Sequence, residues 1–400
     1  MDAFKYTITA KDFDELDICN KDGKEYFLLD VRDAGGFSYG AIPGAVNIPE
    51  EEIDARMGEI PKDKTIIVYC KQGISSKDVS EKLREQGYSV LELHGGYMAW
   101  LVMKMQKDEL LERRSREDAG DETYCQSVEK SIRKKFHKSI FSKFAKAINT
   151  YDLLQPGDKV AVCISGGKDS MLMAKLFQEL KRHNKFDFEL VFLVMDPGYN
   201  EMNRKVIETN ASRLEIPITI FESPIFNSVY EVEKSPCYLC ARMRRGYLYS
   251  KAKELGCNKI ALGHHYDDVI ETILMGMLYG GQVQTMMPKL HSTNFEGMEL
   301  IRPMYLIREE DIKHWRDYND LHFIQCACRF TDDCTTCRAD GSVGSKRMEI
   351  KNTIREMKKI NPYVEANIFK SVENVNLNTI IAYKKQGITH HFLDSYNNPE

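Results

Sequence analysis

Short apolar runs alternate with amphipathic stretches through residues 1–105. Tyr26–Val31 and Thr65–Tyr69 have the composition of buried strands, and Ser76–Gln86 has apolar residues at helical spacing. This alternation predicts an α/β domain, in which a site is expected just beyond the C-terminal end of a strand. Cys70 lies at such a place, in a glycine-containing loop that leads into the predicted helix.

A second α/β unit begins near residue 159. Val160–Ile164 predicts a buried strand, the polar turn Ser165–Ser170 follows it, and Met171–Arg182 has the spacing of an amphipathic helix. Further strands are predicted at Glu189–Met195, Ile216–Phe221 and Lys259–Leu262. The fold class is therefore α/β, with two α/β domains. We expect the first domain at 1–105, a polar linker at 106–129, the second domain at 130–385 and a tail at 386–400.

The composition is that of an ordinary globular chain. Of 400 residues, 42% are hydrophobic and 29% charged, which excludes a disordered or collagenous protein. No apolar run approaches the ~18 residues of a membrane-spanning helix. The N-terminus has no basic segment followed by an apolar one, so no signal peptide, no membrane partner and a cytoplasmic location are expected.

The charge is unevenly distributed along the chain. Residues 1–110 hold 14 basic and 21 acidic residues, whereas the rest hold 42 and 39. Within Gln126–Ala147, seven basic residues accompany one acidic residue, Glu129. This run, which includes Lys134 and Lys135, is compatible with a polyanionic partner or with a merely solvated helix face.

Eleven cysteines in a cytoplasmic chain indicate catalysis or metal binding more than a disulfide framework. A C-x-x-C pair alone can be a zinc knuckle, a redox pair or half of an iron–sulfur site. The closely spaced pairs are Cys237 with Cys240, Cys326 with Cys328, and Cys334 with Cys337. A structural zinc site that uses Cys334 and Cys337 stays open.

A thiol at the mouth of a strand suits a nucleophilic or persulfide-carrying cysteine. Backbone N–H groups of the loop and the positive end of the next helix would stabilise an anionic sulfur on Cys70. A lone cysteine is more commonly a buried structural residue.

The sequence around Cys70 resembles the rhodanese-like sulfurtransferase family over residues 8–103. The resemblance rests on Leu29–Asp33, Gly40–Pro49 and Gly95–Trp100, and it implies that Cys70 carries the persulfide. The chain departs from the family at Ala41, where histidine is usual, and at Lys71 and Ile74, where arginines are common. These departures affect the expected sulfur donor more than the role as a sulfur carrier.

The turn Ser165–Ser170, with the sequence S-G-G-K-D-S, has the chemistry of a phosphate site. Its two glycines let the backbone approach a phosphate, and hydroxyl groups and a helix N-terminus supply donors. It lacks the G-x-x-x-x-G-K-[ST] spacing of a Walker A loop. The turn resembles that of the PP-loop ATP pyrophosphatases, which split ATP into AMP and pyrophosphate and activate a carbonyl oxygen as its adenylate.

Three later segments extend this resemblance to the TtcA-type tRNA 2-thiocytidine synthetases, over roughly residues 130–375. They are Cys237–Gly246, Ile260–Asp268 and Met277–Gly281. The implied second domain is an adenine nucleotide alpha hydrolase-like, doubly wound parallel sheet. The implied cofactors are ATP, Mg²⁺ and a [4Fe–4S] cluster with three cysteine ligands and one open iron.

The resemblance and the local chemistry together assign the candidate site residues. Cys70 and Asp169 are expected to be catalytic. The ATP site is expected to comprise Ser165, Gly166, Gly167, Lys168, Asp169, Ser170, Gly263, His264 and His265, with Asp267 and Asp268 on the Mg²⁺ side. The expected cluster ligands are Cys237, Cys240 and Cys326, with Cys328 as a rival for the third place. The expected tRNA contacts are Arg242, Arg244, Arg245, Lys134 and Lys135, although one of the arginines could be only solvated.

The expected activity is ATP-dependent formation of 2-thiocytidine at position 32 of tRNA, in the anticodon loop, by adenylation and iron–sulfur-assisted thiolation. Cys70 would relay sulfur from a cysteine desulfurase or another persulfide donor, and a homodimer is compatible with the sequence. The alternatives are a 2-thiouridine-forming relative and a non-catalytic sulfur- or redox-sensing protein. A lysidine-type tRNA ligase is disfavoured because it has no use for the cysteine set.

Overall fold

The computed structural model describes residues 6–19, 25–119, 123–183, 186–223, 225, 236–324 and 346–396. Within these ranges, the side chains of 112–119, 236–241 and 395 lie outside the description. The chain divides into two compact units, the first containing Met1–Tyr266 and Met287–Ser345, the second containing Asp267–Met286 and Lys346–Glu400.

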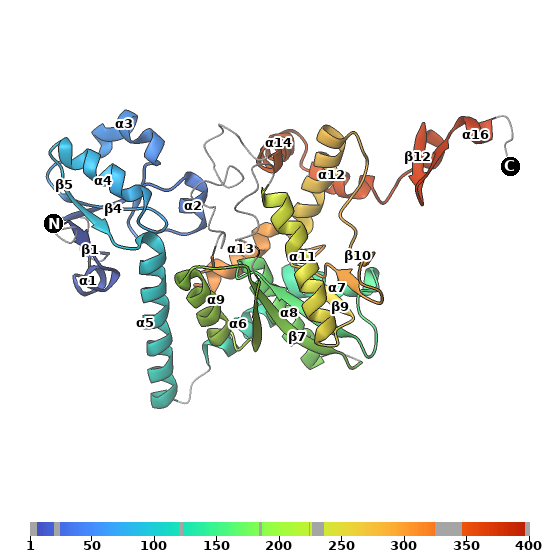
Figure 1. Ribbon diagram of the computed structural model, residues 1–400, viewed down its shortest axis with the longest axis horizontal. Helices are drawn as coiled ribbons and strands as arrows, with labels where there is room; N and C mark the ends of the chain where they lie inside the picture. The colour runs from blue at the N-terminus through green and yellow to red at the C-terminus, as the bar shows by residue number, and fades with distance from the viewer. Residues whose placement is uncertain are drawn as a thin grey trace. The chain divides into compact units, whose positions relative to one another are not determined.

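The N-terminal part of the first unit is a parallel five-stranded sheet in the order β1-β5-β4-β2-β3 (Figure 1). The strands are β1 (Thr7–Ile8), β2 (Tyr26–Asp30), β3 (Val46–Asn47), β4 (Thr65–Tyr69) and β5 (Ser89–Leu93). Its helices are α1 (Ala10–Glu15), α2 (Ala34–Tyr39), α3 (Ile53–Arg56), α4 (Ser75–Glu85) and α5 (Gly96–Ala119). Both predicted strands and the predicted helix match these bounds within one residue.

The larger part of the first unit is a six-stranded sheet in the order β10-β11-β9-β6-β7-β8. The strands are β6 (Lys159–Ile164), β7 (Glu189–Asp196), β8 (Ile218–Glu222), β9 (Lys259–Ala261), β10 (Lys289–His291) and β11 (Glu299–Ile301), and only the β10–β11 pairing is antiparallel. The chain runs from β6 outward to β7 and β8, and later returns to the other side of β6 with β9. Residues after β6 therefore lie at the switch point, where α/β sheets bind ligands.

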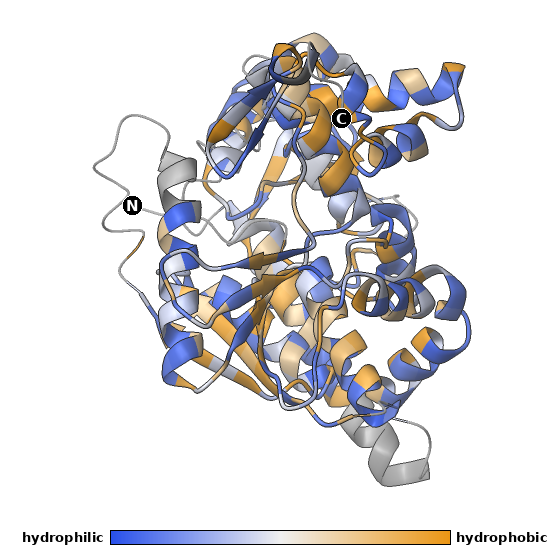
Figure 2. Cartoon of the chain, turned by 90° about the vertical axis from the view of Figure 1, so that its right-hand side faces the viewer, coloured by the Kyte–Doolittle hydropathy of each residue, from blue (hydrophilic) through white to orange (hydrophobic). Residues whose placement is uncertain are grey.

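Helices cover both faces of this sheet, and apolar residues concentrate on the strands between them (Figure 2). They are α6 (Tyr124–Arg133), α7 (Ser142–Thr150), α8 (Lys168–His183), α9 (Glu201–Arg213), α11 (Pro236–Glu254) and α13 (Glu309–Tyr318), with a π-helical turn η3 at His137–Phe141. The predicted doubly wound parallel sheet is thus confirmed, with one antiparallel edge strand.

The second compact unit is mostly helical. It comprises α12 (Tyr266–Gly280), α14 (Lys346–Ile360), α15 (Val364–Ser371), the hairpin β12 (Ala382–Lys385) and β13 (Ile388–His391), and α16 (Leu393–Tyr396). Arg347 on α14 forms ion pairs with Asp268 and Glu271 on α12. The boundary expected at residue 385 falls in the turn of the hairpin.

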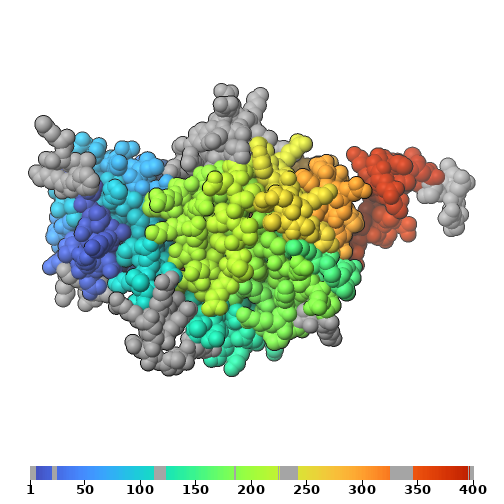
Figure 3. Space-filling model, turned by 60° about the horizontal axis from the view of Figure 1, so that its bottom comes forward, coloured from blue at the N-terminus to red at the C-terminus, as the bar shows by residue number. Residues whose placement is uncertain are grey.

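The segment expected to be a linker, 106–129, contains much helical structure. α5 continues through it to Ala119, and α6 begins at Tyr124. α5 packs against α9, and the two helices occupy adjoining cyan and light-green surfaces in Figure 3. No helix among the described residues is long and apolar enough to cross a membrane.

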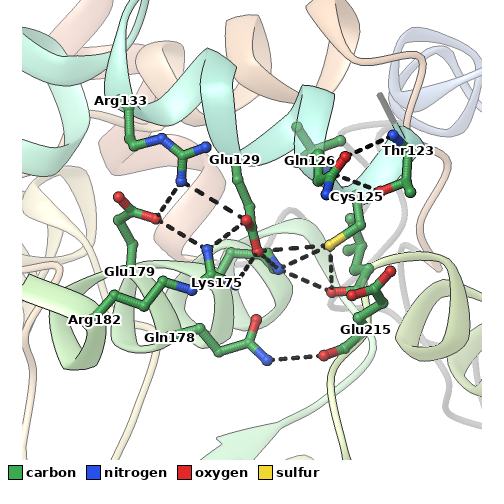
Figure 4. Close-up of polar contacts among 12 residues, drawn as sticks. Thr123, Cys125, Gln126, Glu129, Arg133, Lys175, Gln178, Glu179, Arg182 and Glu215 are labelled. Atoms are coloured by element: carbon green, nitrogen blue, oxygen red, sulfur yellow. Dashed lines mark hydrogen bonds and ion pairs between the residues drawn. The ribbon is translucent and has the colours of Figure 1, made fainter. Parts of the chain in front are cut away.

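A buried polar network fastens α6 to α8 (Figure 4). The Lys175 side chain is 1% exposed, and its Nζ donates to Glu129 Oε1 at 2.7 Å and to the Leu214 carbonyl oxygen at 2.9 Å. The same Nζ lies 3.3 Å from Cys125 Sγ. Arg182 also binds Glu129, with Nη2 2.8 Å from Oε1. Burial alone would raise the pKa of Glu129, but hydrogen bonds from Arg182 and Lys175 outweigh it and lower this pKa to about 2.

Lys175→Met should therefore destabilise the protein by about 3 kcal/mol, because it leaves a buried carboxylate and a buried carbonyl short of a donor. Lys181→Met, on the exposed part of the same helix, is the matched control and should change stability by less than about 0.5 kcal/mol. Urea unfolding followed by circular dichroism measures both values.

The effect of Lys175→Met should depend on pH in a defined direction. A carboxyl with a lowered pKa in the folded state adds stability above its unfolded value and loses it as the pH falls. The difference between wild type and Lys175→Met should thus shrink as the pH falls from 4.5 toward about 2. A difference that stays constant over this range would show that Glu129 is not the group that Lys175 stabilises.

Candidate active site: a thiol cradle and a phosphate loop

Cys70 lies directly after β4, and its sulfur is held by backbone donors. The N–H groups of Gly73 and Ile74 point at Cys70 Sγ at 3.1 and 3.2 Å. The loop leads into α4, whose N-terminal end adds a positive potential. Backbone N–H donors in this position are the groups that the expected role of Cys70 as a persulfide carrier requires.

The start of α5 clamps the Cys70 loop from the other side. Tyr97 N–H donates to the Cys70 carbonyl oxygen at 2.9 Å, and Met98 N–H donates to that of Lys71 at 3.1 Å. A Cβ on Gly96 would lie 2.4 Å from the Cys70 carbonyl oxygen, and Gly96 has φ +59°. Only glycine fits there, which explains the G-G-x-x-A-W segment in physical terms.

A buried ion pair between Asp30, the last residue of β2, and Arg32 supports the Cys70 loop. Asp30 is fully buried and accepts from Arg32 Nη2 at 2.5 Å. The Arg32 guanidinium also lies 4.2 Å from the centre of the Tyr97 ring and donates to the Gly40 carbonyl oxygen at 2.8 Å. Arg32 thus connects the helix that clamps Cys70 with the turn after α2.

The residues expected to form the phosphate loop, Ser165–Ser170, lie together at the end of β6. Gly166 has φ +85°, and a Cβ there would lie 2.5 Å from Ile207 Cγ1 and 2.7 Å from Ile324 Cδ1. The Ser170 hydroxyl accepts from Ser165 N–H at 3.2 Å and donates to the Gly167 carbonyl oxygen at 3.0 Å. The loop is thereby folded tightly over the first turn of α8, and the first N–H groups of a helix have no acceptor within that helix.

Charged side chains meet at the start of α8. Lys168 Nζ lies 3.0 Å from Asp169 Oδ2 and 3.5 Å from Glu309 Oε1 on α13. Burial lowers the pKa of Lys168, but Asp169 and Glu309 outweigh it, so this pKa lies above its usual value and the ammonium group stays charged. A charged ammonium group beside a helix N-terminus suits an anionic ligand.

The end of β9 closes against the phosphate loop. A Cβ on Gly263 would lie 3.4 Å from Ser170 N, so this strand end passes directly over the start of α8. His265 is buried. Asp267 and Asp268 belong to the second compact unit, where Asp268 pairs with Arg347.

The expected cluster ligands fall largely outside the described residues. α11 begins at Pro236 and so carries Cys237 and Cys240 in its first turn, but their side chains lie outside the description. Cys326, Cys328, Cys334 and Cys337 lie wholly outside it. The described free cysteines other than Cys70 are Cys19, Cys125, Cys163 and Cys257.

The basic residues expected to contact tRNA differ in their surroundings. Lys134 and Lys135 are exposed, and Lys135 Nζ lies 3.6 Å from the centre of the Tyr318 ring. Arg242 and Arg245 are exposed on α11, whereas Arg244 is half-buried. Two members of the basic run are engaged internally, since Arg133 pairs with Glu179 at 2.9 Å and Lys143 with Asp311 at 3.1 Å.

Sequence reasoning missed three residues at the mouth of the phosphate loop. Glu309 and Arg316 come from α13, and Tyr39 comes from the end of α2, in the domain that carries Cys70. Tyr39 Oη donates to the Ile324 carbonyl oxygen at 3.2 Å, and Arg316 Nη1 donates to the Tyr39 carbonyl oxygen at 3.1 Å. No local signal in the sequence marks these contacts.

The fold and site define a rhodanese-like domain joined to a PP-loop domain. Residues 12–103 match the family model of the rhodanese-like domain, and residues 136–332 match that of the PP-loop domain. A tRNA-cytidine(32) 2-sulfurtransferase of Neisseria meningitidis serogroup C is 35% identical over 247 residues, 60% of this chain and 73% of the relative. One of Alkalilimnicola ehrlichii is 36% identical over 248 residues, 60% of this chain and 74% of the relative. This chain belongs to the family of tRNA-cytidine(32) 2-sulfurtransferases.

Among solved structures, the chain is similar to the U34-tRNA thiolase NcsA from Methanococcus maripaludis with its [4Fe–4S] cluster. The identity is 22%, the TM-score is 0.46, and the match covers 58% of this chain and 76% of that one. A rhodanese-related protein from Thermoplasma volcanium is 29% identical over 24% of this chain and 89% of its own, with a TM-score of 0.22. Both domain resemblances stated from the sequence are confirmed by the family matches.

Proposed function

We propose that this protein uses ATP to replace the C2 oxygen of cytidine 32 in tRNA by sulfur. The observation that carries the proposal is the phosphate loop at the switch point of a chain in the tRNA-cytidine(32) 2-sulfurtransferase family. In a chain of that family, the same loop supplies the donors that an ATP-dependent adenylation needs.

The phosphate loop carries the first half of the reaction. Backbone N–H groups of Gly166–Lys168 and the N-terminus of α8 bind the phosphates, and Lys168 offsets their charge. The C2 oxygen attacks the α-phosphorus, and pyrophosphate leaves. Asp169, beside Lys168, is the catalytic residue that we assign to orienting the triphosphate. The oxygen is then part of AMP, which is a far better leaving group.

The Cys70 loop supplies the sulfur for the second half of the reaction. Cys70 accepts a persulfide from a cysteine desulfurase or another donor, and the Gly73 and Ile74 amides stabilise the anionic sulfur. Its outer sulfur passes to a nucleophile at the thiolase site, and the Cys70 thiolate is released. The terminal sulfur of the persulfide formed there adds at C2, and AMP leaves. A second thiol then attacks the carrier sulfur, so the S–S bond breaks, a disulfide forms on the protein and C2 keeps its sulfur as a thiocarbonyl; a thiol reductant then restores the two thiols.

We assign Cys237, Cys240 and one of Cys326 and Cys328 as the ligands of a [4Fe–4S] cluster. Cys237 and Cys240 are three residues apart in the first turn of α11, and positions at this spacing share a helix face. Thiolates are the ligands that iron–sulfur clusters take. The cluster, when bound, supplies an iron that can hold a soft sulfur anion.

Lys134 and Lys135 form part of the surface that we assign to tRNA. The double variant Lys134→Glu/Lys135→Glu should weaken tRNA binding about tenfold or more at low salt and reduce the salt dependence, because phosphate contacts release counterions. ATP affinity should not change. Filter binding over a salt series measures the first two effects.

Lys62→Glu is the matched control for this experiment. Lys62 is also exposed and also lies over a tyrosine, with its Nζ 5.2 Å from the centre of the Tyr88 ring, but in the rhodanese-like domain. It should bind tRNA as wild type does. Normal tRNA binding by the Lys134/Lys135 variant would mean that this run is only a solvated helix face.

Mass spectrometry of tRNA nucleosides from a strain lacking this protein tests the function directly. We expect 2-thiocytidine to disappear and to return when the gene is restored. Loss of a 2-thiouridine instead would indicate a thiouridine-forming enzyme, and no change in any thionucleoside would favour a sulfur- or redox-sensing protein.

A further inference from the structure

The segment 321–324, which follows α13, lies against the phosphate loop. A Cβ on Gly166 would lie 2.7 Å from Ile324 Cδ1, and a Cβ on Gly167 would lie 3.7 Å from the Ile324 carbonyl oxygen. Ile324 is 3% exposed, so its side chain is packed in the protein rather than against water. Ile324 therefore contacts both of the glycines that let the loop backbone approach a phosphate.

The two residues before Ile324 are held by the PP-loop domain itself. Asn210 Nδ2 on α9 donates to the His322 carbonyl oxygen at 2.8 Å. Phe323 is buried, and its ring stacks on Trp315 of α13 with the ring centres 6.3 Å apart. Neither contact involves the Ile324 carbonyl group, which is the part of the segment that lies beside the second glycine of the loop.

The Ile324 carbonyl group is held from the rhodanese-like domain. The Tyr39 hydroxyl, at the end of α2, donates to its oxygen at 3.2 Å. Arg316 on α13 contacts the same tyrosine twice, because its Nη1 donates to the Tyr39 carbonyl oxygen at 3.1 Å and its guanidinium carbon lies 5.3 Å from the centre of the Tyr39 ring. Arg316 is buried, and polar contacts shielded from water are stronger than the same contacts at a surface.

We propose that Tyr39 is a positioning residue of the phosphate loop, and that it couples docking of the rhodanese-like domain to nucleotide binding by holding Ile324 on the two glycines. The proposal rests on the proposed function in one respect, that the phosphate loop binds ATP. A loop that is packed in place before the nucleotide arrives loses less conformational entropy when it binds.

The coupling acts in both directions. If the docked rhodanese-like domain strengthens nucleotide binding by some factor, bound nucleotide strengthens the docking by the same factor. ATP therefore favours the docked position of the domain that carries Cys70 at the stage when the base is adenylated. A chain in which this domain is detached from Ile324 binds ATP more weakly, so adenylation is favoured when the sulfur carrier is in place.

Tyr39→Phe in the full-length protein tests the proposal. It keeps the ring beside Arg316 and removes only the hydroxyl that binds Ile324, so a non-hydrolysable ATP analogue should bind about fivefold more weakly, as expected for the loss of one hydrogen bond. Tyr39→Ala also removes the ring and should weaken binding about tenfold. Isothermal titration calorimetry measures both affinities.

Tyr88→Phe is the matched control. Tyr88 is in the same domain, and its hydroxyl also donates to a backbone carbonyl oxygen, that of Met57 at 3.3 Å, but this contact stays within the rhodanese-like domain. Its affinity for the analogue should equal that of wild type. If Tyr39→Phe binds the analogue as tightly as wild type and Tyr88→Phe do, or more tightly, the proposal is wrong.

Hydrogen exchange gives a readout that a merely structural role would not move. In wild type, the analogue should slow amide exchange in α2 as well as in the phosphate loop, because the coupling is reciprocal. In saturated Tyr39→Phe it should still slow exchange in the phosphate loop but change that in α2 little. Unchanged or faster exchange in α2 of wild type on analogue binding would overturn the proposal. If wild type binds no analogue at all, the ATP site of the proposed function fails, and the coupling fails with it.

Discussion

Cys70→Ala should slow tRNA thiolation about a hundredfold when sulfur arrives as a limiting persulfide, yet leave it unchanged when sulfide is in excess. A donor tethered in the same chain acts at a millimolar effective concentration, against the micromolar concentration of a free donor. The variant loses the only sulfur that the Gly73 and Ile74 amides hold. Free sulfide does not need that carrier. Radiolabelled sulfur or mass spectrometry of the product tRNA measures both rates.

Two further variants make this experiment decisive. Cys19→Ala removes an exposed thiol from the same domain and should thiolate as wild type does. Asp169→Ala should stop thiolation with either sulfur source, because adenylation precedes both routes. Equal rates for Cys70→Ala and wild type under limiting persulfide would show that the rhodanese-like domain serves another reaction.

Features that depend on neighbouring residues were predictable from the sequence. Thr65–Tyr69 forms the expected strand, and Cys70 begins the expected loop, because apolar composition and a glycine turn act over a few residues. The phosphate loop was predictable for the same reason. Gly166 is tied to its place by φ +85°, a conformation that glycine adopts far more readily than other residues.

Features that depend on distant residues were not predictable. Tyr39 meets Arg316 and Ile324 only because the two domains pack together, and a pattern along one segment contains no trace of that packing. The basic run shows the same limit. Its charges look alike in sequence, but Arg133 forms an ion pair with Glu179, and this partner lies on another helix.

The cysteine pair on α11 leads to the second large effect. Protein purified without oxygen should contain about four iron atoms per chain, and Cys237→Ala or Cys240→Ala should lose nearly all of them, because a cluster with one anchor fewer is not retained. Iron analysis and the visible absorbance measure the loss. Cys257→Ala is the matched control, since the Cys257 thiol is buried in an apolar cluster. This variant should contain as much iron as wild type.

The third ligand is decided by comparing Cys326→Ala with Cys328→Ala, of which one should lose the iron and the other keep it. The retained iron reports on coordination alone, so the comparison does not require active enzyme. Thiolation should fall in parallel with the iron content, because an iron that holds sulfur is then missing from the site. One zinc per chain and no iron after anaerobic purification would contradict the assignment, and the cysteines would then form a structural zinc site.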